Sequence, residues 1–381
     1  MRRAHWTLSG LYSRGFERFE GVGRFERVKA CLDCLPCLAR NAIDLARKSA
    51  QDDAALEAEI ARSGMEILGS AAADGYPLPP PCYARRLIDN ALAKSGGRVP
   101  DPWAKEKKCS TELALRLMEQ MGLYTNGNCH NRSQITNTNL DISALSRMLA
   151  HPSGSASPNL PSDASHLWRI SSLREINNSM SDFEKRVRLA VAGNILDFSI
   201  YADLDIAAAM ETMATAFTKP VDGAAVAELK RRMDEAKSIL WIFDNCGEAV
   251  FDRLLMEPYR DKLTLAVRGK PAFNDLTRAE LEESGFPPDF SRGKVVSNDD
   301  GVPGVVDATC GAAFRAAFAA ADLIVAKGQA NFETMNERAD KPIAFLFLAK
   351  CPVVCRAVGA APKTIQVFLP HEGSEPRAKP L

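Results

Sequence analysis

Apolar residues recur at intervals of three and four positions through the first two thirds of the chain, the spacing of helices that bury one face. The clearest such segments are 35–50, 52–73, 109–123, 183–200 and 204–217. A proline cluster at 77–81 separates two helices, because proline cannot continue one. The pattern predicts an α-helical region that precedes a different kind of structure.

Two stretches lack this periodicity. Residues 1–26 have no clear period, and we expect them to form a flexible N-terminal arm. At about 125–180 the composition shifts to Asn, Ser, Thr, Pro and Gly, which supply turns and few core residues, so we expect a low-complexity insertion at the surface. Three of the five histidines fall in it, where they are poor candidates for a preorganised site: His130, His151 and His166.

Past residue 236 short apolar runs alternate with helical segments. The runs are 238–243, 262–267, 294–297, 322–326, 342–349 and 364–369. Strands that alternate with helices form parallel sheets with both faces covered. The chain is therefore predicted to be α/β, a doubly wound, mostly parallel, Rossmann-like sheet preceded by an α-helical domain. The expected division is an arm at 1–26, a helical domain at 27–235 and an α/β domain at 236–381.

Charge and hydropathy exclude some classes of protein. The chain has 48 Lys and Arg against 48 Asp and Glu, so a general attraction to nucleic acid or to an anionic membrane is absent. No run approaches the ~18 consecutive apolar residues of a spanning helix. The first twenty residues lack the apolar core of a signal peptide. We expect a cytoplasmic protein with no nucleic-acid or membrane partner, and its oligomeric state stays open.

Ten cysteines in a chain of 381 residues are too few for a disulfide scaffold. Cys31, Cys34 and Cys37 form two overlapping C-x-x-C units, a spacing that suits a second metal site or a redox site. The alternative is that the three thiols simply pack at a helix start. A closed metal site needs a fourth ligand, and the candidates lie far along the chain: Cys82, Cys109 and Cys129. Two further thiols in an apolar segment are expected in the core: Cys351 and Cys355.

Four of the predicted strands end in acidic, amide or basic residues beside a glycine. In a doubly wound sheet, ligands bind beyond the carboxyl ends of the strands. The four segments are 244–248, 268–275, 298–301 and 327–331. Asp and Asn are common at such places as turn and cap residues, and we expect Asp299 and Asp300 to be turn residues. Four such segments on one edge of the sheet nevertheless favour a ligand site.

The residue types narrow the chemistry of that site. Asp and Asn oxygens without nearby His or Cys suit a hard cation such as Mg²⁺ or Mn²⁺, and Arg268 and Lys327 can bind phosphate. Together they favour phosphoryl chemistry. The chain has no P-loop, and neither G-x-G-x-x-G nor Asp-x-Asp follows the first strand of the α/β part.

Four ordered blocks then resemble one known family. They are DNCGEAVFDRLL at 244–255, AVRGKPAFNDLT at 266–277, DLIVAKGQANFET at 322–334 and FLAKCPVVCRAVG at 347–359. These blocks resemble the metal-dependent damage-control phosphatase family, formerly a domain of unknown function. AGNILDF at 192–198 and the Cys-x-x-Cys near the start resemble its prokaryotic subfamily. The insertion, Cys37 and the arm depart from the pattern.

The resemblance implies hydrolysis of phosphate monoesters of small, damaged or side-product metabolites with a divalent metal, Mn, Mg, Co or Ni. It implies metal ligands at Asp244, Asn245 and Asp275, which with Lys327 form the catalytic set. It places Lys327 and Asn331 at the phosphate. The pocket would be lined from the α/β side by Glu248, Arg268 and Asn274, and from the helical side by Asn194 and Asp197. Whether water or a carboxylate attacks stays open.

Several alternatives remain at this stage. Glu248 could cap a helix, Asn194 could pair with buried backbone, and Asp197 could pair with an arginine. A redox or metal-sensing protein would use the cysteine triplet as its working site. A small-molecule methyltransferase would need a Gly-rich loop after the first strand, where DNCGE has a single glycine.

Overall fold

The computed structural model describes residues 28–125, 134–135, 179–195, 206–338 and 340–370. The expected N-terminal arm, most of the expected insertion with its three histidines, and Asp197 lie outside these ranges. Within them, no helix has the length and apolar character needed to cross a membrane.

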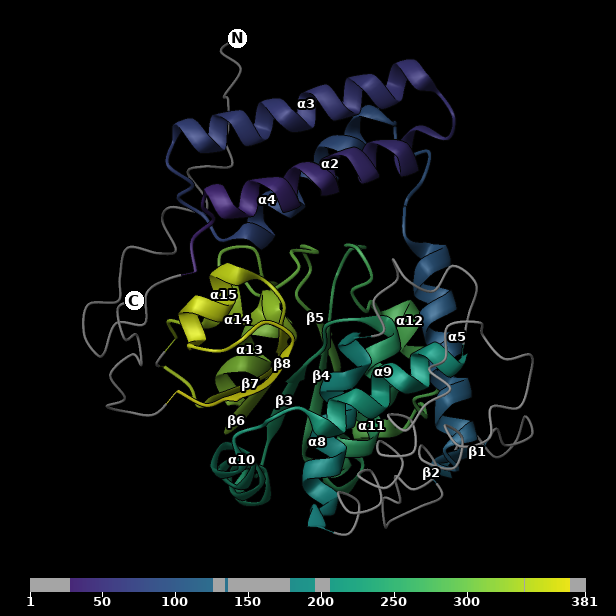
Figure 1. Cartoon of the computed structure of the whole chain (residues 1–381), viewed down its shortest axis with the longest axis vertical. Helices are drawn as coiled ribbons and strands as arrows, with labels where there is room; N and C mark the ends of the chain where they lie inside the picture. Colours follow the sequence, from purple (N-terminus) through teal and green to yellow (C-terminus); the bar gives the residue numbers. More distant parts are fainter. Residues whose placement is uncertain (1–27, 126–133, 136–178, 196–205, 339, 371–381) are drawn as a thin grey trace, which may run out of the picture.

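A layer of helices begins the described chain. The short helix η1 (Leu32–Cys34) leads into α2 (Leu35–Ala50), α3 (Ala54–Ala73) and α4 (Pro80–Lys94). Asp53 caps α3 by accepting a hydrogen bond from the Leu56 N–H at 3.1 Å, and the proline cluster starts α4. Figure 1 shows this layer lying across one end of the sheet. Helix α5 (Ala104–Gln120) then runs down beside the sheet.

Six strands form the main sheet in the order β5-β4-β3-β6-β7-β8. They are β3 (Ile239–Ile242), β4 (Leu263–Val267), β5 (Val295–Ser297), β6 (Leu323–Lys327), β7 (Ile343–Ala349) and β8 (Thr364–Phe368). All neighbours are parallel except β7 and β8. Each of these strands coincides with an apolar run expected from the sequence, although β6 extends one residue beyond its run, to Lys327. The mostly parallel sheet is therefore confirmed. A separate antiparallel pair joins β1 (Tyr124–Thr125) and β2 (Gln134–Ile135).

Side chains alternate between the two faces of this sheet, and each face has its own core. Trp241 and Val325 pack on one side. That side is covered by α5, α8 (Asp182–Ala192), α9 (Ile206–Thr218), α10 (Gly223–Glu235), α11 (Cys246–Met256) and α12 (Arg278–Glu283). Leu240 and Ile324 pack on the other, under α13 (Ala312–Ala320), α14 (Gln329–Met335) and α15 (Pro352–Val358). The doubly wound arrangement follows from this period of two.

The short helices η2 (Gly193–Ile195), η3 (Glu257–Lys262) and η4 (Phe290–Gly293) complete the elements. Helices α5 and α8–α10 share the core of the sheet. Helices α2–α4 form a separate cluster, which also contains Ala272, Val302 and Val306 from loops of the α/β part. The division into domains at residue 235 therefore stays a prediction.

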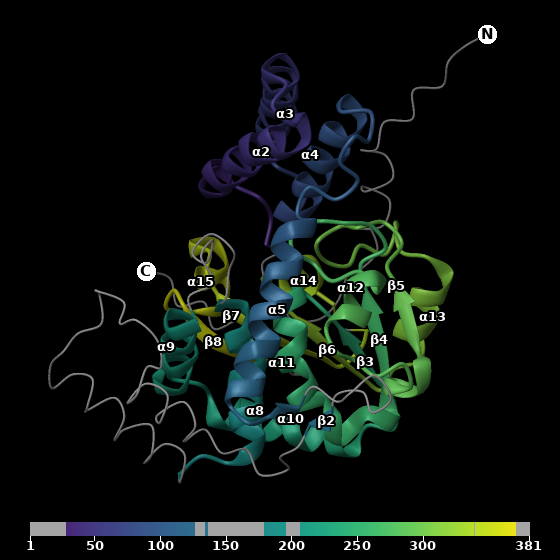
Figure 2. The same cartoon turned by 90° about the vertical axis from the view of Figure 1, so that its right-hand side faces the viewer.

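Strand β3 is the switch point of the sheet, since β4 lies on one side of it and β6 on the other. The α2–α4 layer lies over the carboxyl ends of the strands (Figures 1 and 2). Arg85 of α4 ties the layer to this edge by donating to the carbonyls of Pro271 at 3.1 Å and Gly301 at 3.4 Å. Ligand sites of doubly wound sheets form at this place.

Candidate metal and phosphate site

The loops after β3 and β4 bring three expected metal ligands together. Asp244 and Asn245 follow β3 directly, and the loop after β4 folds back against them. The Leu276 N–H donates to the Asp244 carbonyl at 2.8 Å, and the Cys246 N–H donates to the Asn274 carbonyl at 2.9 Å. Asp275 is thereby paired with Asn245. This pairing is long-range in sequence, and it fixes the two carboxylates at one edge of the sheet.

Two asparagines bridge two carboxylates at this edge. Asn194 Nδ2 donates to Asp244 Oδ2 at 3.0 Å and to Glu248 Oε2 at 2.8 Å. Asn245 Nδ2 donates to the same two oxygens at 3.0 and 3.3 Å. Asn194 comes from η2, so the expected approach from the helical side is present. Asn194 thus donates to two carboxylates, whereas Glu248 also lies in the first turn of α11, where the helix dipole favours its charge. The functional roles of both residues stay predictions.

Close approach of η2 to α11 depends on glycine. A Cβ atom on Gly193 would lie 2.8 Å from Glu248 Cα, too close for any side chain. A second glycine, Gly328 after β6, has φ +80°, and a Cβ there would lie 1.9 Å from Asp244 Oδ2. The glycines beside the polar residues therefore make room for the carboxylates.

Arg268, at the end of β4, is held on several sides. Its Nε donates to Asp275 Oδ2 at 2.6 Å and its Nη1 to the Gly304 carbonyl at 3.0 Å. Asn331 Oδ1 lies 3.4 Å from both terminal nitrogens, and Asp244 Oδ1 lies 4.0 Å from Nη2. With 2% of its surface exposed, the guanidinium is a fixed charge between the two aspartates.

Lys327 and Asn331 reach the site but point inward. Lys327 Nζ donates to Asp252 Oδ1 at 2.7 Å, to the Ala190 carbonyl at 3.0 Å and to Glu248. Asn331 Nδ2 donates to the carbonyls of Phe243 and Lys327. The structure thus places the Lys327 ammonium under the carboxylates, where it holds Glu248, and the expected contact of both residues with phosphate stays a prediction.

Asp252 is a member of this group that the sequence reasoning missed. It lies one helical turn after Glu248 on α11, and the spacing of four residues was the available signal. It is fully buried and also accepts from Trp241 Nε1 at 3.3 Å. Burial raises the pKa of Asp252 to about 7, although Lys327 opposes the rise.

The remaining residues of the edge have simpler positions. Asn274 is half-buried beside Asp275. Asn298, which follows β5, joins the loop after β4 by accepting a hydrogen bond from the Gly269 N–H at 2.9 Å. Asp299 is exposed in a left-handed turn with φ +67°, and Asp300 accepts from the Val302 N–H. Both are turn residues, as predicted.

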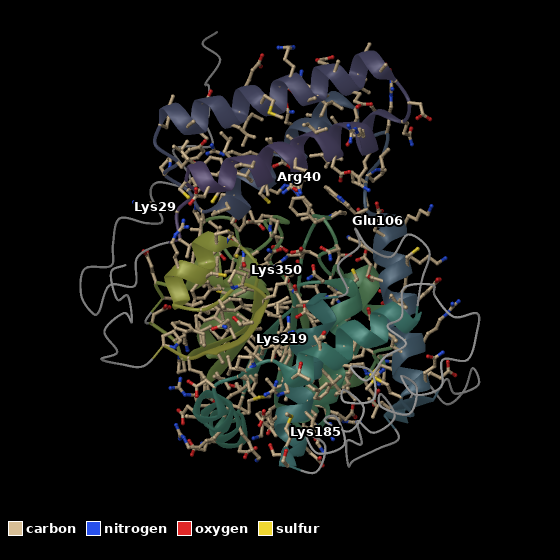
Figure 3. All side chains as sticks on the ribbon, viewed as in Figure 1. Lys29, Arg40, Glu106, Lys185, Lys219 and Lys350 are labelled. Carbon is tan, nitrogen blue, oxygen red and sulfur yellow. The ribbon has the colours of Figure 1, made fainter. Side chains whose placement is uncertain are left out.

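The site carries excess negative charge. Six ionisable side chains are buried together, four acids and two bases: Asp244, Glu248, Asp252, Asp275, Arg268 and Lys327. With all six ionised, two negative charges are uncompensated. Burial, Asp275 and Glu248 raise the pKa of Asp244 well above its usual value. Arg268 opposes this rise, and so, to a lesser extent, does the exposed Lys350, labelled in Figure 3. Burial also raises the pKa of Asp275, against the pull of Arg268.

A divalent cation fits this donor set. Carboxylate and amide oxygens are the ligands of hard cations, and a charge of +2 would neutralise the group. Across the described ranges no three His, Cys, Asp or Glu side chains are already placed to hold a metal ion. The expected ligands are thus two aspartates, Asp244 and Asp275, together with the Asn245 amide oxygen. Such a cation would keep coordination positions for water and an anion.

Comparison with known proteins identifies the family of the chain. The profile of the damage-control phosphatase ARMT1-like domain matches residues 30–364. The chain belongs to this family. The resemblance carried by the four sequence blocks is thus confirmed. Family membership favours a phosphatase over the methyltransferase and the redox or metal sensor considered above.

Two curated proteins and one solved structure are similar to this chain. The chain is 38% identical to "Damage-control phosphatase PH1575" of Pyrococcus horikoshii over 46% of its own length and 61% of that protein. It is 30% identical to "Damage-control phosphatase" of Archaeoglobus fulgidus over 48% of its length and 64% of that protein. These matches span about three fifths of the relatives. The crystal structure of a DUF89 family protein from P. horikoshii superposes with a TM-score of 0.63 and 25% identity, covering 90% of this chain and 99% of that one.

Proposed function

We propose that this chain is a divalent-metal-dependent phosphatase that hydrolyses phosphate monoesters of small, damaged or side-product metabolites. The observation that carries the proposal is the buried group of four acids and two bases at the switch point of the sheet. There Asp244 and Asp275 lie on either side of Arg268, and Asn245 pairs with Asp275. Family membership and the relatives named as damage-control phosphatases support the same reaction.

Asp244, Asn245 and Asp275 would hold the metal, Mn²⁺, Mg²⁺, Co²⁺ or Ni²⁺. When bound, the metal supplies charge stabilisation for the transferring phosphoryl group and orients it. Asn194 fixes the rotamer of Asp244 by its bond to Oδ2, and the Arg268 guanidinium does the same for Asp275. Both ligands are thus preorganised by neighbours that are themselves buried.

The protein's own cations complete the site. Burial alone would lower the pKa of Lys327, but Asp252 and Glu248 outweigh it and raise that pKa, so the ammonium stays charged. Lys327 therefore keeps Glu248 in place under Asn194 and Asn245. Arg268 and the exposed Lys350 supply positive charge on the side where a phosphate would enter.

We expect the partner of this site to be a small phosphorylated metabolite. We expect neither a nucleic acid nor a membrane as a partner. The cytoplasmic location expected from the sequence stays a prediction.

The test is hydrolysis of p-nitrophenyl phosphate by EDTA-stripped protein to which each of the four metals is returned. Asp244→Asn should lower metal-restored turnover by about 100-fold or more, since it removes a ligand charge. The matched control is Asp299→Asn, the same exchange in an exposed turn of the same edge, which should retain activity. Equal turnover of Asp244→Asn and the wild type, in folded protein, would refute the assignment.

A further inference from the structure

The loop that carries Asp275 has a backbone conformation that is unusual for its residue type. Phe273 has φ +45°, in the left-handed region that glycine adopts readily and that bulky side chains disfavour. It is the first of the two central residues of a turn, which the Asp275 N–H closes by donating to the Ala272 carbonyl at 2.9 Å. Turns with positive φ at this position usually have Gly, Asn or Asp there. An aromatic residue in this place therefore needs a compensating contact.

The turn determines where the expected metal ligand lies. The Asn274 carbonyl, inside the turn, accepts from the Cys246 N–H at 2.9 Å. Asp275, directly after it, pairs with Asn245 in an isolated bridge. Both contacts require the chain to leave the turn in the direction that the positive φ of Phe273 gives it. The backbone conformation of Phe273 is thus connected to the position of Asp275 through two adjacent peptide units.

The compensating contact comes from the helical layer. The ring of Phe273 lies 5.0 Å from the ring of Trp103, measured between centroids, and the two planes are tilted by 55°. Trp103 is 6% exposed and belongs to the hydrophobic cluster of α2–α4, which also contains Ala272. Aromatic pairs at this separation stabilise a fold beyond the apolar area that they bury. The pair can therefore hold the turn in a conformation that the residue alone would avoid.

Trp103 is itself fixed by its neighbours. Its backbone N–H, directly before α5, donates to Asp101 Oδ1 at 3.0 Å. Asp101 Oδ2 pairs with Lys107 Nζ at 2.8 Å, and the buried Lys107 ammonium also lies 3.2 Å from Glu280 of α12. Since α12 follows the loop of Phe273 along the chain, the ring of Trp103 is anchored on both sides of that loop.

We propose that Phe273 is a positioning residue of the metal site, whose ring, held by Trp103, keeps the turn at positive φ and so places Asp275. The inference rests on the proposed function, in which Asp275 is a metal ligand. Arg85 of α4 holds the same loop by donating to the Pro271 carbonyl at 3.1 Å. The cluster of α2–α4 thereby takes part in metal binding, although none of its residues is an expected ligand.

Variants that differ in their tolerance of positive φ test the proposal. Phe273→Ala, Phe273→Asn and Phe273→Gly all remove the ring, but Asn adopts positive φ more easily than Ala, and Gly most easily. Binding of Mn²⁺ to EDTA-stripped protein is measured by electron paramagnetic resonance of the free ion. The dissociation constant should rise about tenfold in Phe273→Ala and recover most of that rise in the Asn and Gly variants. A ring that only fills space would give three equal variants.

The matched control is Phe318→Ala. It removes a buried ring from another aromatic pair, that of Phe314 and Phe318 on α13, where the backbone is helical. This variant should lose stability and keep the wild-type affinity for Mn²⁺.

A second measurement needs no metal. Glycine ordinarily makes a fold less stable than alanine does, whereas at a position with positive φ the order is reversed. In urea unfolding with EDTA present, Phe273→Gly should therefore have a higher midpoint than Phe273→Ala.

Two results would overturn the proposal. One is a Phe273→Ala variant that binds Mn²⁺ as tightly as the wild type; the other is a Phe273→Ala variant at least as stable in EDTA as Phe273→Gly. In either case Mn²⁺ binding by the wild type leaves the metal site of the proposed function standing. A wild type that binds no Mn²⁺ would instead refute that metal site and, with it, the positioning role of Phe273.

Discussion

Replacing Lys327 by methionine isolates the buried charge that supports the site. The substitution keeps the length of the side chain and removes the ammonium that contacts Glu248 and Asp252. Both acids are at most 1% exposed, so they would be left without their cation in a medium that solvates charge poorly. Removing one partner of a buried pair costs about 3–5 kcal/mol. That is a large share of the about 5–15 kcal/mol that stabilises a typical domain.

The loss of folding stability in Lys327→Met should be smaller at low pH than at high pH. The pKa of Asp252 is already raised to about 7, and removal of Lys327 raises it further. The acid can therefore take up a proton in the variant, and Lys327→Met should lose less stability at pH 6 than at pH 8. The double variant Lys327→Met/Asp252→Asn, which also removes one negative charge, should recover part of the loss.

Urea unfolding followed by tryptophan fluorescence measures these differences, since Trp241 is buried against Asp252. Lys294→Met, at an exposed position, is the control and should change the free energy of unfolding by less than about 0.5 kcal/mol. A loss below about 1 kcal/mol for Lys327→Met, or a double variant no more stable than the single one, would show that Lys327 does not hold the two acids.

Three further predictions concern other parts of the fold. Gly328→Ala should lower both stability and metal-restored hydrolysis, because its Cβ would overlap the Asp244 carboxylate. The control is Gly223→Ala, where space is open; in thermal unfolding it should be neutral or stabilising by up to about 1 kcal/mol. Arg85→Gln should raise KM more than it lowers kcat in the p-nitrophenyl phosphate assay, since it releases two loop carbonyls at the edge of the site; an unchanged KM would contradict this. The arginines beside Glu228 lower its pKa to about 2, so its small stabilisation, under about 1 kcal/mol, should be present above pH 4.5 and fade as the pH falls toward 2. Urea titrations of Glu228→Gln and wild type across that range check the sign.

The sheet could be predicted from the sequence because its strands are buried on both faces. Such strands appear as unbroken apolar runs, and all six runs became strands. The meeting of Asp244 with Asp275 also followed from topology, since the carboxyl ends of parallel strands share one edge.

What the sequence could not provide was the direction of side chains and contacts between distant segments. Lys327 is the last residue of β6, yet its ammonium turns inward to Glu248 and Asp252, because two buried acids attract it more strongly than an open edge does. Cys351 lies in an apolar run and was expected in the core. It is half-buried instead, at the place where α15 meets η1 through the bond of Arg356 to Asp33, and no local pattern encodes that packing.

Binding of Mn²⁺ to EDTA-stripped protein, measured by electron paramagnetic resonance of the free ion, shows whether the edge between β3 and β4 holds a metal. We predict one Mn²⁺ bound per chain at the carboxyl-end site, displaced by Mg²⁺, lost in Asp275→Asn and retained in both Asp299→Asn and Cys351→Ser. Wild-type Mn²⁺ binding by Asp275→Asn, or none by the wild type itself, would contradict a metal site between β3 and β4.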